Sequence, residues 1–217
     1  MSIKYCIWDV GHTIYPYTLA YLNKWAFAHT TDKAAYQNQG GIKAFDYAPY
    51  MAGKINDEEF ARSFCHQYNI PFERQTLLAI NEAMHRGVGD FFPETLQTMA
   101  FLFEQGITNG ILSNALPLLK DTAPQQIKSE YCFPSYELKL LKPNPEIYHE
   151  VRRRLGCRFD EMIFVDDKKK NVQSAVNLGI HGIVYDKNTI KAQCKMIVEN
   201  AAKELPLQFK HSPAGRE

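Results

Sequence analysis

The chain has 217 residues, of which 45% are hydrophobic, and it carries 25 basic against 24 acidic side chains. This is the composition of a globular protein that is large enough for one α/β core and a smaller attached unit. A formal net charge of +1 argues against nucleic acid or an anionic membrane as a partner, and no run of about 20 apolar residues indicates a membrane span.

The N-terminus leads directly into a strand pattern, so no signal peptide is recognisable. The five cysteines are scattered and form no CxxC pair: they are Cys6, Cys65, Cys132, Cys157 and Cys194. This usage is typical of reduced, buried thiols, and it predicts a cytoplasmic protein.

Strand and helix patterns alternate along most of the chain. The expected strands are short apolar runs at 4–8, 108–112, 162–165 and 182–185. The expected helices are 93–105, 145–155, 171–178 and 189–203. Glycines at 106, 156 and 179 follow three of these helices, as is common at helix ends. The alternation predicts an α/β fold with a doubly wound parallel sheet that is covered by helices on both faces.

One segment, from about residue 17 to residue 87, interrupts this alternation with helical periodicity and no convincing strand. Asn56 and the three acidic residues after it predict a capped helix that continues to about Tyr68. Aromatic residues recur through the segment at spacings that suit a small helical core: Trp25, Phe27, Tyr36, Phe45, Tyr47, Tyr50, Phe60, Phe64 and Tyr68. We therefore expect an all-helical unit inserted after the first strand.

The expected domain organisation follows from this insertion. Residues 1–16 and 88–210 form the α/β core, residues 17–87 form the helical unit, and residues 211–217 form a disordered tail. Gly87 and Gly89 are candidate hinge residues, although an ordinary loop explains them equally well.

Polar side chains follow the predicted strands at the points where these strands end. They are Asp9, Ser113, Asn114, Asp166 and Asp167, and Lys142 stands just before the helix at 145–155. Each alone has an ordinary explanation as a turn former, a helix cap or a solvated charge. Because ligands of open parallel sheets bind beyond the carboxyl ends of the strands, together these residues predict a site with carboxylates, a hydroxyl, an amide and an ammonium.

Four segments in order resemble the motifs of the haloacid dehalogenase-like (HAD) hydrolase superfamily, and the resemblance covers almost the whole chain. The segments are "IWDVGHT", "GILSN", "LKPNPEIY" and "FVDDKKKNVQSAVNLG". The third and fourth are specific, whereas the second is weak alone. The resemblance implies a Rossmann-like core whose helical insertion is a C1-type cap, in the branch of C1-capped phosphatases.

The same resemblance implies roles for the site residues. Asp9 resembles the family nucleophile, which forms an aspartyl-phosphate that water then hydrolyses. Ser113 and the amides next to Asn114 are expected to bind phosphoryl oxygens. Lys142 is expected to neutralise Asp9 and the phosphate, because a carboxylate and a phosphate dianion repel each other.

A magnesium ion is the cofactor that this chemistry implies, since Mg²⁺ takes oxygen ligands and retains water. The expected ligands are a carboxylate oxygen of Asp9, the backbone carbonyl of Gly11, and the pair Asp166 and Asp167. Of this pair, Asp167 is the stronger candidate for direct ligation, with Asp166 ordering metal-bound water.

Gly11 departs from the Asp-x-Asp pattern of many phosphatases in the superfamily, in which the second aspartate transfers protons. Some members that are similar to sugar-1-phosphate phosphatases carry an Asp-x-Gly pattern instead. His12 is one candidate to bind substrate and transfer the proton, and the alternative is that it only occupies a turn. Tyr15 and Tyr17 are further candidates, or else packing residues.

The resulting expectation is a Mg²⁺-dependent phosphatase acting on a small phosphorylated metabolite, either a sugar phosphate or a nucleotide. One alternative is a metal-free 2-haloacid dehalogenase, although two adjacent carboxylates favour a cation. Another is a catalytically impaired module that binds a phosphoryl ligand or a protein, because Gly11 replaces the second aspartate. The sequence leaves the oligomeric state open.

Overall fold

The computed structural model describes residues 2–122 and 129–203. Within these residues, five parallel strands form a sheet in the order β3-β2-β1-β4-β5. The strands are β1 (Tyr5–Trp8), β2 (Thr108–Ser113), β3 (Cys132–Pro134), β4 (Met162–Asp166) and β5 (His181–Val184). The predicted doubly wound parallel sheet is confirmed.

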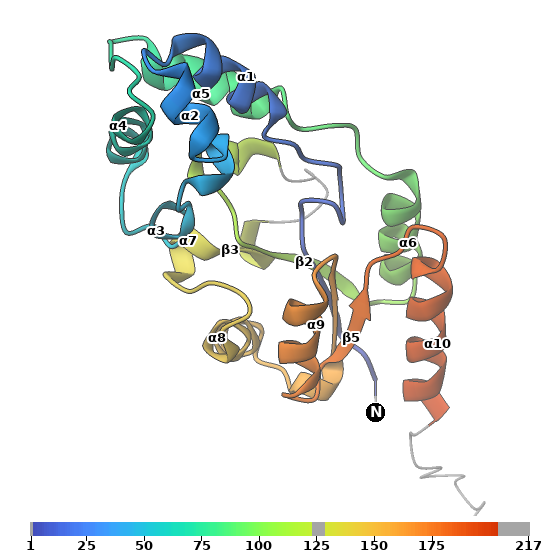
Figure 1. Cartoon of the computed structure of the whole chain (residues 1–217). Helices are drawn as coiled ribbons and strands as arrows, with labels where there is room; N and C mark the ends of the chain where they lie inside the picture. The colour runs from blue at the N-terminus through green and yellow to red at the C-terminus, as the bar shows by residue number, and fades with distance from the viewer. Residues whose placement is uncertain (1, 123–128, 204–217) are drawn as a thin grey trace, which may run out of the picture.

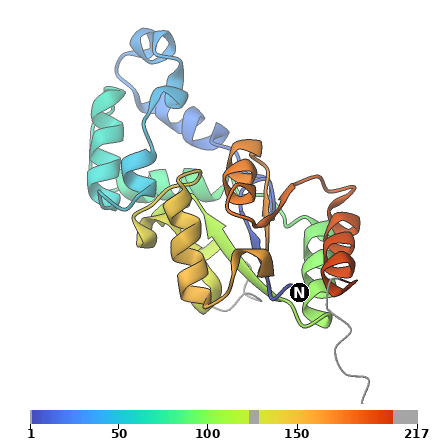
Figure 2. The same ribbon diagram turned by 90° about the horizontal axis from the view of Figure 1, so that it is seen from below.

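Helices cover both faces of the sheet, as Figures 1 and 2 show. Helices α6 (Pro93–Glu104) and α10 (Ile190–Lys203) pack on one face, and α8 (Pro145–Leu155) and α9 (Lys169–Val176) pack on the other. Side chains alternate across a strand, so Cys6 and Trp8 join the core beneath α6 and α10, whereas Ile7 joins the core beneath α8. Burial on both faces explains why these strands read as continuous apolar runs.

A helical segment follows β1 and lies beyond the carboxyl ends of the strands (Figure 1). Its elements are α1 (Ala20–His29), α2 (Lys33–Asn38), the 3-10 helix η1 (Gly41–Ala44), α3 (Ala48–Met51), α4 (Asp57–Gln67) and α5 (Thr76–His85). Its core is aromatic as predicted, with Tyr50 stacked on Phe60 at 4.2 Å between ring centroids. Helix α4 begins at the predicted cap, where Asn56 and Glu59 each accept a hydrogen bond from the other's backbone N–H.

The two connections between the helical segment and the core run antiparallel and are hydrogen-bonded to each other. Thr18 donates to the carbonyl of Gly87, and Gly89 donates to the carbonyl of Pro16, both at 2.9 Å. A Cβ atom at Gly87 would lie 1.9 Å from the carbonyl oxygen of Thr18. The structure therefore requires glycine at position 87 for close backbone approach, whether this segment acts as a hinge or is an ordinary loop.

The sequence analysis missed β3 and the short helix α7 (Ser135–Leu138) that follows it. A strand of three residues that ends in proline has no readable alternation, and it forms only because β2 pairs with it. The other short elements are the 3-10 helices η2 (Pro117–Thr122), η3 (Ser129–Tyr131) and η4 (Phe159–Glu161).

The predicted tail lies outside the described residues, and the domain limits at residues 16 and 88 remain predictions. Across residues 2–122 and 129–203, the helices lack the length and apolar character that a membrane crossing requires.

Candidate active site

Register in the sheet brings the polar strand ends together. Trp8 pairs with Ile111 of β2 and with Val165 of β4, so the next residues, Asp9 and Asp166, lie side by side at the same edge. Both are buried, at 6% and 0% exposure, where an unpaired carboxylate would be strongly unfavourable.

Lys142 supplies the charge that makes this burial tolerable. Its ammonium donates to Asp9 Oδ1 at 2.7 Å, to Asp166 Oδ2 at 2.7 Å and to the carbonyl of Leu112 at 2.6 Å. An ammonium has three N–H groups, so all three are used within the protein. Lys142 therefore bridges the two carboxylates, and any donation to a ligand would replace one of these bonds.

Asp166 is saturated with hydrogen bonds. Besides Lys142, it accepts from the backbone N–H of Lys168 at 2.8 Å and from the side-chain amide of Asn171 at 2.9 and 3.0 Å. These donors occupy both carboxylate oxygens and fix the side chain in one orientation. Asp166 is thus suited to holding its neighbours in place, and its expected role in ordering metal-bound water stays a prediction.

Asp167 is in the opposite situation. Its Oδ1 is buried and has no hydrogen-bond partner among the described residues. Burial, together with the nearby charge of Asp9, raises the pKa of Asp167 above its usual value. We call Asp9, Asp166 and Asp167 the carboxylate cluster; one ligand oxygen from each lies within 4.8 Å of the others.

The carboxylate cluster fits a divalent cation. Three carboxylates carry three negative charges, and the bridging ammonium of Lys142 balances one of them. The two remaining charges match Mg²⁺, which binds through one or two carboxylates and retains water. The unpartnered Oδ1 of Asp167 is the kind of orphaned buried group that a metal ion explains.

Gly11 and His12 form the turn that follows Asp9. A Cβ atom at Gly11 would meet nothing nearer than Tyr17 Cβ at 3.9 Å, so there is open space at the position of the second aspartate in the Asp-x-Asp pattern. His12 is exposed and has a left-handed backbone with φ 61°, and its N–H donates to the carbonyl of Tyr15.

Ser113 and Asn114 end β2 and begin the next loop. Ser113 is buried, and its hydroxyl has no hydrogen-bond partner in the described part of the chain. The side chain of Asn114 accepts from the N–H of Lys142 at 2.8 Å and donates to its carbonyl at 2.9 Å. Asn114 therefore holds the Lys142 loop, and of its two amides only the backbone amide is left as a candidate for binding phosphoryl oxygens.

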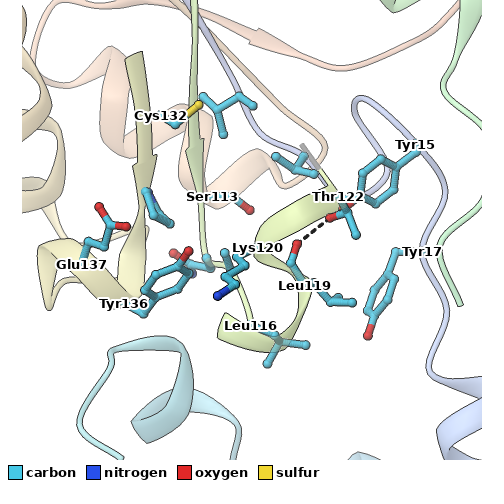
Figure 3. A pocket seen from close by; sticks show the side chains of 16 residues that line it. Tyr15, Tyr17, Ser113, Leu116, Leu119, Lys120, Thr122, Cys132, Tyr136 and Glu137 are labelled. Atoms are coloured by element: carbon cyan, nitrogen blue, oxygen red, sulfur yellow. Dashed lines mark hydrogen bonds between the residues drawn. The ribbon is translucent and has the colours of Figure 1, made fainter. Parts of the chain in front are cut away.

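A cavity of about 490 Å³ opens beside Gly11, Ser113 and Asn114. Figure 3 shows Tyr15 and Tyr17 on one side of it and Tyr136 and Glu137 on the other. We call it the tyrosine cavity, after Tyr15, Tyr17 and Tyr136. His12 does not line it, whereas both tyrosines that the sequence analysis named as candidates do.

Sequence reasoning missed several residues of the site. Asn171 was not named as a site residue, although its side-chain amide holds Asp166. Tyr136 and Glu137 line the cavity because they follow β3, and they were missed because that strand was missed. The rule that polar residues after each strand face the site would have found them once β3 was known.

Known proteins resemble this chain in sequence. A family model described as haloacid dehalogenase-like hydrolase matches residues 26–185. Flavin mononucleotide hydrolase 1 of Arabidopsis thaliana is 30% identical over 142 residues, which cover 63% of this chain and 55% of that protein. Glyceraldehyde 3-phosphate phosphatase of Methanothermobacter thermautotrophicus is 25% identical over 114 residues, half of each chain. The chain thus spans about half the length of these two relatives.

A solved structure resembles it in fold. A HAD family enzyme of Bacteroides thetaiotaomicron, in complex with magnesium and inorganic phosphate, superposes with a TM-score of 0.66 at 22% identity. The superposition covers 86% of this chain and 96% of that one. At this identity the likeness establishes the shared fold.

Proposed function

The chain belongs to the haloacid dehalogenase-like hydrolase family, and we propose that it is a Mg²⁺-dependent phosphatase that acts on a small phosphorylated metabolite. The observation that carries the proposal is the contrast within the carboxylate cluster. Asp9 and Asp166 share the ammonium of Lys142, whereas the buried Oδ1 of Asp167 has no partner among the described residues. The negative charges of Asp9 and Asp167 repel each other, and a site without a metal ion would leave this repulsion uncompensated.

Three residues would hold the ion in this proposal: Asp9 through a carboxylate oxygen, Gly11 through its backbone carbonyl, and Asp167 through Oδ1. Asp166 would hold Lys142 and Asn171 in place beside the ion, because both of its oxygens already accept hydrogen bonds. The ion supplies positive charge that lets a carboxylate approach a phosphate dianion. The magnesium and phosphate bound by the Bacteroides thetaiotaomicron enzyme of the same fold support this assignment.

The reaction proceeds in two displacements. A carboxylate oxygen of Asp9 forms a bond to phosphorus, and the bond from phosphorus to the substrate alcohol oxygen breaks. Water then attacks the aspartyl-phosphate, releases inorganic phosphate and restores the carboxylate. Lys142 holds Asp9 Oδ1, which leaves the other carboxylate oxygen to attack. The Ser113 hydroxyl and the Asn114 backbone amide bind the phosphoryl oxygens.

The leaving alcohol requires a proton. Gly11 has no side chain to give one, and His12 lies outside the cavity lining. The Tyr15 hydroxyl lines the cavity but is bonded to Thr122 Oγ1 at 2.6 Å. The Tyr17 hydroxyl has no partner among the described residues, but burial raises the pKa of Tyr17 and makes it a poor acid. We therefore assign the proton to a water molecule in the open space beside Gly11. Residues 17–87 act as the C1-type cap that closes over the site.

The test is hydrolysis of para-nitrophenyl phosphate and of phosphorylated metabolites, with Mg²⁺ and with EDTA. We expect Mg²⁺-dependent release of phosphate, which is lost in an Asp9→Asn variant. Metal-independent release of halide from 2-haloacids, without phosphatase activity, would instead show a dehalogenase. Binding of phosphate and Mg²⁺ without turnover would show a module that only binds its ligand.

A further inference from the structure

In the proposed function, the tyrosine cavity would hold the part of the substrate that leaves with the alcohol oxygen. Gly11, Ser113 and Asn114 line it, and Ser113 and Asn114 are the residues that we assign to the phosphoryl group. A substrate whose phosphorus faces Asp9 therefore extends its alcohol into the cavity. This step rests on the proposed function.

The size and walls of the cavity indicate what kind of alcohol it takes. Its volume of about 490 Å³ lies within the range of about 300–1,000 Å³ that is usual for sites of drug-sized ligands. Tyrosine rings stand on opposite sides, and Leu116, Leu119 and Ile111 add apolar surface. A short polyol would leave these apolar walls in contact with water, whereas a planar ring would cover them.

Hydrogen bonds anchor part of each wall. The Tyr15 hydroxyl is bonded to Thr122, whose hydroxyl donates to the carbonyl of Leu119 at 2.7 Å. Tyr136 follows Ser135, which donates to the carbonyl of Met51 at 2.6 Å and accepts from the N–H of Ala115 at 3.0 Å. Walls anchored in this way do not collapse onto a small substrate, so the cavity keeps its width.

Lys120 and Glu137 give the cavity polar groups away from the phosphate end. Both are exposed lining residues, and no ion pair joins them to another described residue. They offer a donor and an acceptor to substituents on a ring that lies between the tyrosines.

We propose that the substrate is a phosphate monoester whose alcohol carries a planar heteroaromatic ring, which packs between Tyr15 and Tyr17 on one side and Tyr136 on the other. This selects the nucleotide-like class over simple sugar phosphates.

Matched substrates test the proposal because, within each pair, the bond from phosphorus to the same kind of primary hydroxyl is broken. Flavin mononucleotide and ribitol 5-phosphate both release a primary ribityl alcohol, and adenosine 5′-monophosphate and ribose 5-phosphate both release a ribose 5-hydroxyl. The members of each pair differ in the ring. We expect kcat/KM to be at least about tenfold higher for the ring-bearing member of one pair or both. Equal turnover within both pairs would overturn the inference and leave the phosphatase intact, whereas no turnover of any ester would overturn both.

Variants of Tyr136 connect the preference to the cavity. Tyr136→Ala should lower kcat/KM for the ring-bearing ester by about tenfold and change that for its ring-free partner by less than about twofold. Tyr136→Phe, which keeps the ring, should keep the preference. Tyr21→Ala, which removes an exposed tyrosine of α1 outside the cavity, should change neither. A ring preference that survives in Tyr136→Ala would overturn the assignment.

Discussion

The carboxylate cluster and the tyrosine cavity lie next to each other at the same edge of the sheet, but different forces hold them. In the cluster, the buried carboxylates at the ends of β1 and β4 are fixed by short hydrogen bonds that Lys142 and Asn171 donate. In the cavity, aromatic and apolar walls come from the loops after β1, β2 and β3, and neutral hydroxyls anchor them.

This difference separates two tasks. A phosphoryl-transfer site must keep charges in fixed positions, which a rigid sheet edge provides. Selection among leaving groups depends on shape and apolar contact, which loops can alter without moving the charges. Changes in the cluster should therefore abolish turnover or lower the free energy of unfolding. Changes in the cavity should instead alter which substrates are hydrolysed fastest.

Lys142→Met should have the largest effect. It leaves Asp9 and Asp166 buried without their shared cation, and breaking a buried ion pair costs roughly 3–5 kcal/mol. We expect the free energy of unfolding in urea to fall by about that amount and phosphatase activity to be lost. The control is Lys195→Met, which removes an exposed ion pair and should cost less than about 1 kcal/mol. Equal stability of the two variants would contradict the description of the cluster.

Asp166→Asn and Asp167→Asn should separate structural from metal-binding carboxylates. Asp166→Asn places an amide N–H₂ against groups that themselves donate hydrogen bonds to Asp166. It should lower the free energy of unfolding by about 1–3 kcal/mol. Asp167→Asn removes repulsion from Asp9, so without metal its stability should be unchanged or higher. Calorimetric titration should show Mg²⁺ affinity at least about tenfold weaker in Asp167→Asn. If Asp167→Asn were the less stable variant and still bound Mg²⁺ normally, the two roles would be reversed.

Gly11→Asp should change the cluster and the cavity together. The added side chain has room, and it places a carboxyl group where we assign a water molecule. We expect kcat for ribitol 5-phosphate to rise by about tenfold or more, because a positioned acid transfers the proton. Gly11→Asn adds the same bulk without the acid and should not raise kcat. An equal rise in both variants would mean that proton transfer is not the reason.

Tyr50→Phe should have the smallest effect, and only on the cavity side. The Tyr50 hydroxyl donates to Asp57 at 2.6 Å and accepts from the N–H of Leu118 at 3.1 Å. It therefore ties the 3-10 helix η2, which lines the cavity, to the helical segment. Its loss should cost about 1 kcal/mol and raise KM for ring-bearing esters. Tyr47→Phe loses a hydrogen bond inside the helical segment and should leave KM unchanged. A lower kcat for every ester would place Tyr50 in the cluster's chemistry instead.

The sequence predicted the carboxylate cluster because its members end apolar strands. Asp9 and Asp166 each interrupt a buried run, which identifies both the strand and the edge where it ends. The family resemblance also implied Lys142 as the partner of Asp9. The bridge from Lys142 to Asp166 and the bonds from Asn171 to Asp166 were not readable, because these side-chain contacts depend on tertiary packing.

The tyrosine cavity was not predicted, for a specific reason. One wall follows β3, whose three residues carry no periodicity of their own. The other wall comes from Tyr15 and Tyr17, whose aromatic character fits packing as well as binding. Only the paired sheet shows that these two segments face each other across one space.

The most direct measurement follows phosphorus itself. The protein is mixed with radiolabelled phosphate ester, quenched in acid within one turnover, and digested for mass spectrometry. We predict a label on the peptide that contains Asp9 when Mg²⁺ is present, and none after EDTA or in Asp9→Asn. Phosphate release in Mg²⁺ with no label on Asp9 at any quench time, or with the label on another side chain, would contradict the account.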